Sequence, residues 1–451
     1  MTSNETASDR DDPTTTAPDR ASRRAFLGST AALSTIALAG CMGGDGSGSG
    51  GTDTATATDT PTATPAETAT PTEEPTETEE MESVTPDVPV LNYALTLEHL
   101  ENAFYRDGLA EFSDEELMNA SVLSGFGEQV RMEVPASLAT VGEHEAAHVE
   151  AISATVERLG GTPAEEAEYD FGYETPSEFL AVAQALENTG VAAYAGAAPS
   201  VHSNDVLAAA AGIHSVEARH AGFLNLVNGD SPYPNAVDES MSMAEVLEIA
   251  GQFVTSDTSG MAGTPETESM PVARKAENDT SDVDVLNYAL TLEHLENAFY
   301  RDGLAEFSDE ELMTADVLSP FDEAVRMEVP ASLATAGEHE AAHVTALTDV
   351  VERLGGTPVE EAEYDFGYET PSEFLAVAQA LENTGVAAYA GAAPTVTNDD
   401  VFAAAIGIHS VEARHAGFLN ELNVESPFPA GVDEAMSMAE VREIAGQFIV
   451  G

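Results

Sequence analysis

The sequence contains a set of seven polar and aromatic residues that recurs 195 positions further along the chain. Each set is a lone Glu, a Tyr, a Glu-x-x-His, a second lone Glu and a second Glu-x-x-His. The first set is Glu98, Tyr105, Glu145, His148, Glu187, Glu217 and His220, and the second is Glu293, Tyr300, Glu340, His343, Glu382, Glu412 and His415. Two lone glutamates and two Glu-x-x-His motifs, one on each of four helices, are typical of a bundle that holds two metal ions between its helices.

The spacing within each motif explains this chemistry. A Glu and a His three positions apart lie on the same face of a helix, so both can reach one ion. Four carboxylates nearly balance two divalent cations, and oxygen donors combined with imidazole favour iron or manganese over metals that prefer thiolates. Without cations, four carboxylates in a bundle core would be costly because of desolvation and mutual repulsion. We therefore expect two Fe or Mn ions in each repeat.

Tyrosines accompany the lone glutamates at a fixed spacing of seven residues, which is two helical turns along the same face. They are Tyr105, Tyr194, Tyr300 and Tyr389. We expect their hydroxyls to donate hydrogen bonds to ligand carboxylates and so tune the metal centre. Glu101 also lies near this face and is an alternative ligand to Glu98, which we prefer because only Glu98 has the tyrosine partner.

A competing motif overlaps the same residues. His144, Glu145 and His148 spell H-E-x-x-H, the zinc-peptidase pattern, and His339, Glu340 and His343 repeat it. This interpretation leaves the second Glu-x-x-His and both lone glutamates unexplained. His214 and His409, one turn before Glu217 and Glu412, are either supporting groups of the site or ordinary core histidines.

The apolar spacing is helical throughout both repeats, which predicts an all-α fold. In the first repeat we expect helices at residues 90–105, 134–159, 176–199 and 205–226, and a short fifth helix at 242–253. Gly160 and Gly161 terminate the second helix, and Thr175 with Glu178 caps the third. The connection between these two helices, roughly fifteen residues, is long enough to cross the length of a bundle.

The net charge of the chain indicates which partners and which environment to expect. The 451 residues include 81 acidic and 15 basic ones, for a net charge of -66. Phosphate binding needs basic patches, so nucleic acid is not an expected partner. Molar salt shortens the screening length to about 3 Å and makes such a surface tolerable, so we interpret the charge as adaptation to a very saline environment, such as that of a halophilic archaeon.

The amino terminus reads as an export and anchoring signal. Residues 22–27, Ser-Arg-Arg-Ala-Phe-Leu, resemble a twin-arginine signal, and Leu38 to Cys41 resemble a lipobox whose cysteine becomes lipidated. Residues 42–88 and 256–282 are rich in Thr, Pro, Gly, Ser and acidic residues and predict a disordered stalk and a linker, the latter with a potential glycosylation site at Asn278. We therefore predict a signal at 1–41, a stalk at 42–88, a first domain at 89–255, a linker at 256–282 and a second domain at 283–451. We expect the protein to be anchored at the outer face of the cytoplasmic membrane.

Each repeat resembles a ferritin-like domain, in particular the family that includes desiccation-related and other exported proteins. The resemblance depends on the segment from Leu91 to Glu98, on Glu145 with His148, on Glu187, and on Glu217 with His220. It implies two tandem ferritin-like four-helix bundles, and it implies that these residues and their copies Glu293, Glu340, His343, Glu382, Glu412 and His415 bind metal.

Two functions remain open from the sequence. The first is oxidation of Fe(II) by O₂ or peroxide, or direct removal of peroxide, at a dinuclear centre in each repeat. The second is a non-enzymatic cell-envelope protein that helps survival under desiccation or osmotic stress. The two repeats are further expected to pack as a pseudo-dimer within one chain.

Overall fold

The computed structural model describes residues 85–255 and 281–450. Arg23, Cys41 and Asn278, with the predicted signal and nearly all of the predicted stalk and linker, lie outside these ranges, while the last residues of the predicted stalk and linker begin α2 at Asp87 and α8 at Asp282. Within them the regular elements are helical, and extended pairing is limited to two isolated bridges, Tyr169 with Val254 and Tyr364 with Ile449. The prediction of an all-α fold is confirmed. Among the described helices, none combines the length and apolar character needed to cross a lipid bilayer.

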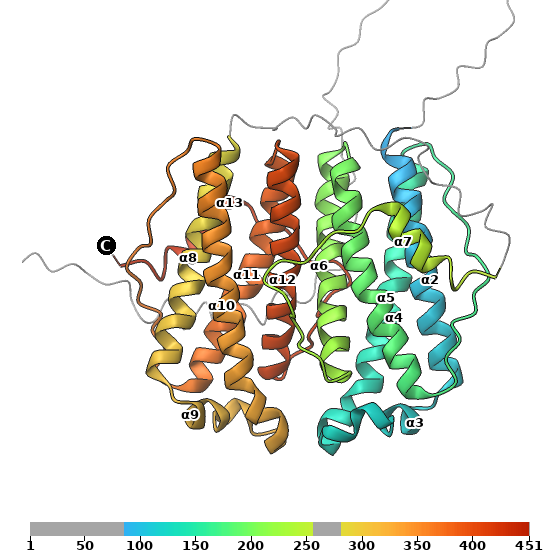
Figure 1. Ribbon diagram of the computed structural model, residues 1–451, viewed down its shortest axis with the longest axis horizontal. Coiled ribbons are helices and arrows are strands. Elements are labelled where there is room, and N and C mark those ends of the chain that lie inside the picture. Colours follow the sequence, from blue (N-terminus) through green and yellow to red (C-terminus); the bar gives the residue numbers. More distant parts are fainter. Residues whose placement is uncertain (1–84, 256–280, 451) are drawn as a thin grey trace, which may run out of the picture.

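Each repeat forms a bundle of four long helices (Figure 1). In the first repeat these are α2 (Asp87–Glu111), α4 (Glu128–Arg158), α5 (Pro176–Ala197) and α6 (Asn204–Val227), with the short helices α3 (Asp114–Met118), η2 (Ser121–Gly125), η3 (Ala198–Ser200) and α7 (Met243–Ala250). In the second they are α8 (Asp282–Glu306), α10 (Glu323–Arg353), α11 (Pro371–Ala392) and α12 (Asp399–Leu422), with α9 (Asp309–Met313), η5 (Asp316–Leu318), η6 (Ala393–Thr395) and α13 (Met438–Ala445). Helix α2 packs along α4 and α5 along α6, so the bundle is built from two helix pairs.

Local sequence signals account for several helix ends. The Thr175 side chain accepts a hydrogen bond from the backbone N–H of Glu178, and Pro176 occupies the first turn of α5. Ser242 and Glu245 form a reciprocal capping box at the start of α7. Gly160, just beyond α4, has a φ of 79°, a left-handed conformation that glycine adopts without steric cost.

The predicted start of the second helix is wrong. We expected it at residue 134, but α4 begins at Glu128 and includes Pro135, a residue that fits best in a first turn, in its interior. The buried positions Val130, Val134 and Leu138 continue one apolar stripe across the proline. Burial of that stripe against the bundle therefore outweighs the lost backbone hydrogen bond. Helix α2 also extends beyond the predicted 90–105, to Glu111.

Aromatic side chains join the long connection between α4 and α5 to the bundle. Phe104 of α2 stacks on Phe179 of α5 with ring centroids 4.7 Å apart, and Phe171 from the connection meets Phe104 edge-on at 5.1 Å. Gly108 lies directly against the Phe179 ring, where a Cβ would approach to 2.1 Å. This close packing fixes α2 against α5, two of the helices that carry candidate ligands.

The two bundles lie side by side and pack through α6 and α12 (Figure 1). Small apolar residues make the centre of this contact: Val191, Ala218, Ala221, Val386, Ala413 and Ala416. His214 and His409 face each other there with Nδ1 atoms 3.4 Å apart, both almost fully buried. Burial is the largest cause that lowers their pKa values, to about 4 for His409. The pair therefore belongs to the interface between the repeats.

One loop from each repeat crosses this interface and contacts the other repeat, and we call these two loops the crossing arms. Arm 1 comprises residues 228–242, between α6 and α7, and arm 2 comprises residues 423–437, between α12 and α13. In arm 1 the Asp238 N–H donates to Gly407 O of α12 at 3.1 Å, and the Met241 N–H donates back to Ala192 O of α5 at 3.0 Å. Arm 2 makes the corresponding contacts with Gly212 and Ala387. Each arm thus leaves its own bundle, contacts the other and returns (Figure 1).

Candidate metal centre

The four long helices of each bundle direct six carboxylate and imidazole side chains into its core. All six have an exposed fraction of 1% or less in both repeats: Glu98, Glu145, His148, Glu187, Glu217 and His220 in the first, and Glu293, Glu340, His343, Glu382, Glu412 and His415 in the second. Helices α2 and α5 supply one glutamate each, and α4 and α6 supply one Glu-x-x-His each. Every residue of the predicted ligand set therefore lies in the bundle interior.

These side chains form two overlapping groups in each bundle. Glu98, Glu145, His148 and Glu217 place one donor atom each within 4.8 Å of the others, and so do Glu145, Glu187, Glu217 and His220. Glu145 and Glu217 belong to both groups. The second repeat has the same arrangement, with Glu340 and Glu412 shared. Two shared carboxylates flanked by separate Glu and His donors would provide ligands for a pair of ions, with Glu145 and Glu217 placed to hold both.

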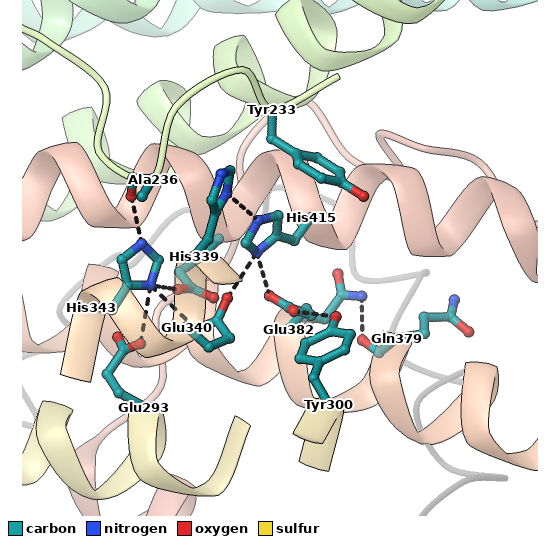
Figure 2. Close-up of polar contacts among 12 residues, drawn as sticks. Tyr233, Ala236, Glu293, Tyr300, His339, Glu340, His343, Gln379, Glu382 and His415 are labelled. Carbon is teal, nitrogen blue, oxygen red and sulfur yellow. Dashed lines mark hydrogen bonds and ion pairs between the residues drawn. The ribbon is translucent and has the colours of Figure 1, made fainter. Parts of the chain in front are cut away.

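The histidines present the same ring nitrogen to the carboxylates. Nδ1 of His148 lies 3.1 Å from Glu98 Oε2 and 3.1 Å from Glu217 Oε1. Nδ1 of His220 lies 3.0 Å from Glu145 Oε1 and 3.3 Å from Glu187 Oε2. Figure 2 shows the equivalent arrangement in the second repeat, where Nδ1 of His343 and of His415 faces the glutamates.

The tyrosines contact the glutamate of the opposite helix pair. Tyr105 of α2 donates its hydroxyl hydrogen to Glu187 Oε1 of α5 at 2.5 Å, and Tyr194 of α5 donates to Glu98 Oε1 of α2. In the second repeat, Tyr300 donates to Glu382 and Tyr389 donates to Glu293. Each lone glutamate thus has one oxygen fixed by a phenol and the other directed towards the cluster.

Several buried oxygens in the cluster lack a hydrogen-bond donor. Both carboxylate oxygens of Glu217, Oε2 of Glu187 and Oε1 of Glu145 accept no hydrogen bond, although histidine nitrogens lie nearby. Buried carboxylate oxygens without donors are costly. Bound cations would satisfy them, so the donor set fits a pair of metal ions.

Burial, followed by repulsion among the carboxylates, shifts the pKa values of the cluster. Burial is the main cause that raises the pKa of Glu98 to about 7, and burial with neighbouring carboxylates raises the pKa of Glu217 well above its usual range. Burial alone would raise the pKa of Glu145 too, but His148 and His220 lower it below its usual value. Burial would lower the pKa of His220, yet Glu187 and Glu145 raise it to about 9. Without bound cations, protons would have to balance the charge of these carboxylates.

Glu101 is a fifth carboxylate beside the cluster. It is 3% exposed, and burial together with Glu217 and Glu187 raises its pKa well above the usual range. It belongs to neither four-residue group. Gly190 of α5 makes room for it, because a Cβ there would lie 3.0 Å from Glu101 Oε1 and 3.3 Å from Glu217 Oε2. Sequence reasoning missed Gly190, whose only signal was a glycine inside an otherwise regular helix three residues after a lone Glu.

His144 does not point into either ligand group. Its Nδ1 lies 3.1 Å from Nε2 of His220, on the side of that ring away from the carboxylates, and His339 contacts His415 in the same way. The H-E-x-x-H residues therefore do not converge on one ion. The geometry contradicts the zinc-peptidase interpretation and makes His144 a support for the His220 ring.

The remaining histidines have local structural contacts. His99 and His294 place Nε2 against the backbone oxygens of Ala164 and Val359, at 3.0 and 3.1 Å. His202 lies 3.2 Å from Asp87, near the beginning of α2.

Comparison with known proteins agrees with this geometry. The family described as "Ferritin-like domain" matches residues 86–230 and residues 281–425, which are the two bundles and more than half of the chain. No curated protein matches the sequence. The matched ranges include all twelve candidate ligands, and the chain belongs to the ferritin-like domain family, with two tandem copies of the domain.

Proposed function

We propose that each repeat is a dinuclear metal centre that binds two Fe or Mn ions and oxidises Fe(II) with O₂ or peroxide, or removes peroxide. The observation that supports this most strongly is the pair of overlapping ligand groups sharing Glu145 and Glu217, with buried oxygens that lack donors. Four carboxylates and two imidazoles are hard to intermediate donors, which suits these metals.

A pair of such ions, when bound, would supply a redox couple for O₂ or peroxide. The residues of the chain would act around it. Glu145 and Glu217 would hold both ions at a fixed separation, and Glu98 and Glu187 would each hold one. Tyr105 and Tyr194 fix the orientation of those two outer carboxylates by hydrogen bonds. Burial of all six donors excludes bulk water from the cluster.

Metal analysis combined with an activity assay tests the proposal. Protein reconstituted with Fe(II) or Mn(II) should contain about two ions per repeat, which means four per chain. The variant Glu145→Gln/Glu340→Gln removes one shared carboxylate charge from each centre with little change in shape. It should lose most bound metal and both Fe(II) oxidation and peroxide consumption.

The outcome also separates the alternatives. Wild-type protein without stoichiometric metal would refute the dinuclear centre. Four bound ions with no turnover of Fe(II) or peroxide would instead support the second candidate, a non-enzymatic envelope protein related to desiccation survival, for which the retained ligands stabilise the fold.

We further propose that the protein is exported by the twin-arginine route, lipidated at Cys41 and held at the outer face of the cytoplasmic membrane of a halophile. The residue pattern around Arg23, Arg24 and Cys41 and the net charge of -66 support this. Metabolic labelling with a radioactive lipid precursor should mark the wild-type chain and not Cys41→Ser. Equal labelling of both would refute the lipid anchor.

A further inference from the structure

A backbone oxygen from the other repeat contacts one candidate histidine ligand in each bundle. Nε2 of His148 in repeat 1 lies 2.6 Å from the backbone oxygen of Gly431 in arm 2. Nε2 of His343 in repeat 2 lies 2.5 Å from the backbone oxygen of Ala236 in arm 1, as Figure 2 shows. A carbonyl only accepts hydrogen bonds, so Nε2 carries a proton in either protonation state of the ring, and Nδ1, which faces the carboxylates, is the nitrogen that would give up its proton and coordinate a bound ion. The resulting neutral tautomer is the one a metal ligand needs.

The same arms pack against the second histidine of each centre. The Phe428 ring of arm 2 meets the His220 ring edge-on at a centroid distance of 5.0 Å. The Tyr233 ring of arm 1 meets the His415 ring in the same way at 4.6 Å. Each arm therefore contacts both imidazoles of the other repeat, one through a backbone oxygen and one through an aromatic ring.

Ion pairs between the repeats anchor the arms. Arg219 Nε of repeat 1 donates to Asp433 Oδ2 of arm 2 at 2.8 Å, and Arg414 Nε donates to Asp238 Oδ2 of arm 1 at 2.8 Å. Arg219 and Arg414 are 2–3% exposed and the two aspartates 10–12%, so these pairs are shielded from solvent. Each aspartate follows the carbonyl that reaches the histidine by two positions.

Glycines in α6 and α12 permit this close approach. A Cβ at Gly212 would lie 2.6 Å from Asp433 O and 2.8 Å from Val432, and Gly407 is in the same position towards Asp238 and Val237. The backbone of each arm thus lies directly on the helix that carries a Glu-x-x-His of the other repeat.

We propose that each crossing arm is a positioning element for the metal centre of the opposite repeat, so that neither repeat holds a complete centre by itself. This inference rests on the proposed function, because it assumes that the clustered donors bind metal. It assigns Gly431, Phe428 and Asp433 to the centre of repeat 1, and Ala236, Tyr233 and Asp238 to the centre of repeat 2.

The test uses the full chain with one centre disabled at a time. Glu340→Gln/Glu412→Gln removes both shared carboxylates of repeat 2 and leaves the centre of repeat 1 to be observed. Glu145→Gln/Glu217→Gln leaves only the centre of repeat 2. Co(II) is the probe, because its affinity and its visible absorption spectrum both report the coordination of the ion without requiring turnover.

Asp433→Asn and Asp238→Asn are then compared in both backgrounds. With only the centre of repeat 1 intact, Asp433→Asn should weaken Co(II) binding by about 10–100-fold and change the spectrum, as loss of groups that orient ligands does. Asp238→Asn should leave that centre unchanged. With only the centre of repeat 2 intact, the two variants should exchange their effects.

Phe428→Leu and Tyr233→Leu give a second pair of variants that keeps the ion pairs, and thermal unfolding of the metal-free proteins checks that all variants fold. Phe428→Leu should weaken Co(II) binding only at the centre of repeat 1, and Tyr233→Leu only at the centre of repeat 2. The inference is overturned if arm variants alter the centre of their own repeat, or if neither pair alters any centre in folded protein. Failure of the unmodified chain to bind Co(II) would instead refute the proposed function itself.

Discussion

Replacing Gly190 with alanine tests whether the space beside the shared glutamate is needed for metal binding. The new Cβ would lie 3.0 Å from Glu101 Oε1 and 3.3 Å from Glu217 Oε2, both closer than ordinary van der Waals contact. Overpacking of this kind costs about 1–3 kcal/mol, whereas Gly→Ala inside a helix gains about 0.5–1 kcal/mol. We therefore expect the metal-free variant to lose between roughly 0 and 2.5 kcal/mol of stability.

The variant should also lose metal affinity, whether or not its folding is affected. Glu217 belongs to both ligand groups, so a shift of its carboxylate by a few tenths of an ångström disturbs both ions. Changes in groups that orient ligands typically cost 10–100-fold in affinity, about 1.4–2.7 kcal/mol. Co(II) titration in the Glu340→Gln/Glu412→Gln background measures this loss, and Gly385→Ala should act on the other centre in the same way.

Gly222→Ala is the matched control. Gly222 also lies inside a helix, but its Cβ would meet its nearest neighbours, Pro232 O and Arg414 Cβ, at 3.4 and 3.6 Å, which is ordinary contact. This variant should gain up to about 1 kcal/mol and bind Co(II) like its parent. If Gly190→Ala binds Co(II) as tightly as Gly222→Ala, the steric reasoning is refuted.

Two further predictions concern pH and salt. The folded metal-free protein holds protons on Glu98, whose pKa burial raises from 4.5 to about 7, and on His220, whose pKa neighbouring carboxylates raise from 6.5 to about 9 against the effect of burial. Each group stabilises the fold fully below its unfolded pKa, and this stabilisation is lost as the pH rises through its folded pKa. The Tm of the metal-free protein should therefore fall from pH 5 to pH 9 in constant high salt. A rise in Tm over this range would contradict these pKa shifts. With a net charge of -66, helical circular dichroism should decrease between 4 M and 0.1 M salt, and a signal unchanged over that range would show that the charge is not an adaptation to salinity.

The helical architecture could be predicted because local signals and long-range packing agree along most of the chain. Gly160 with its positive φ ends α4, and Thr175 with Pro176 begins α5, where the sequence indicates. At Pro135 the local sequence signal and the long-range packing favour different structures. Local chemistry favours a helix start, whereas the buried stripe through Val130 and Val134 continues the helix, and only the packed bundle shows which effect is stronger.

The position of the candidate ligands inside the bundles could be predicted because it depends on helical periodicity alone. The partner of each tyrosine could not, because spacing along α2 places Tyr105 near its own Glu98, whereas the bundle brings it to Glu187. The arm contacts to His148 and His343 had no side-chain signal in the sequence. Gly431 and Ala236 contact the histidines through backbone oxygens, which any residue possesses.

Exchange of arms within a single chain permits a difference that two identical chains cannot have. In a homodimer of one repeat, both centres would receive the same arm. Here the centre of repeat 2 lies against Tyr233, whose hydroxyl donates to Ser332 O at 2.9 Å, and the centre of repeat 1 lies against Phe428, which has no hydroxyl. A substitution in one arm thus changes the surroundings of the centre in the other repeat, while the six ligands of that centre stay the same. Fusion of the two repeats therefore allows two centres with equivalent donor sets to acquire different properties.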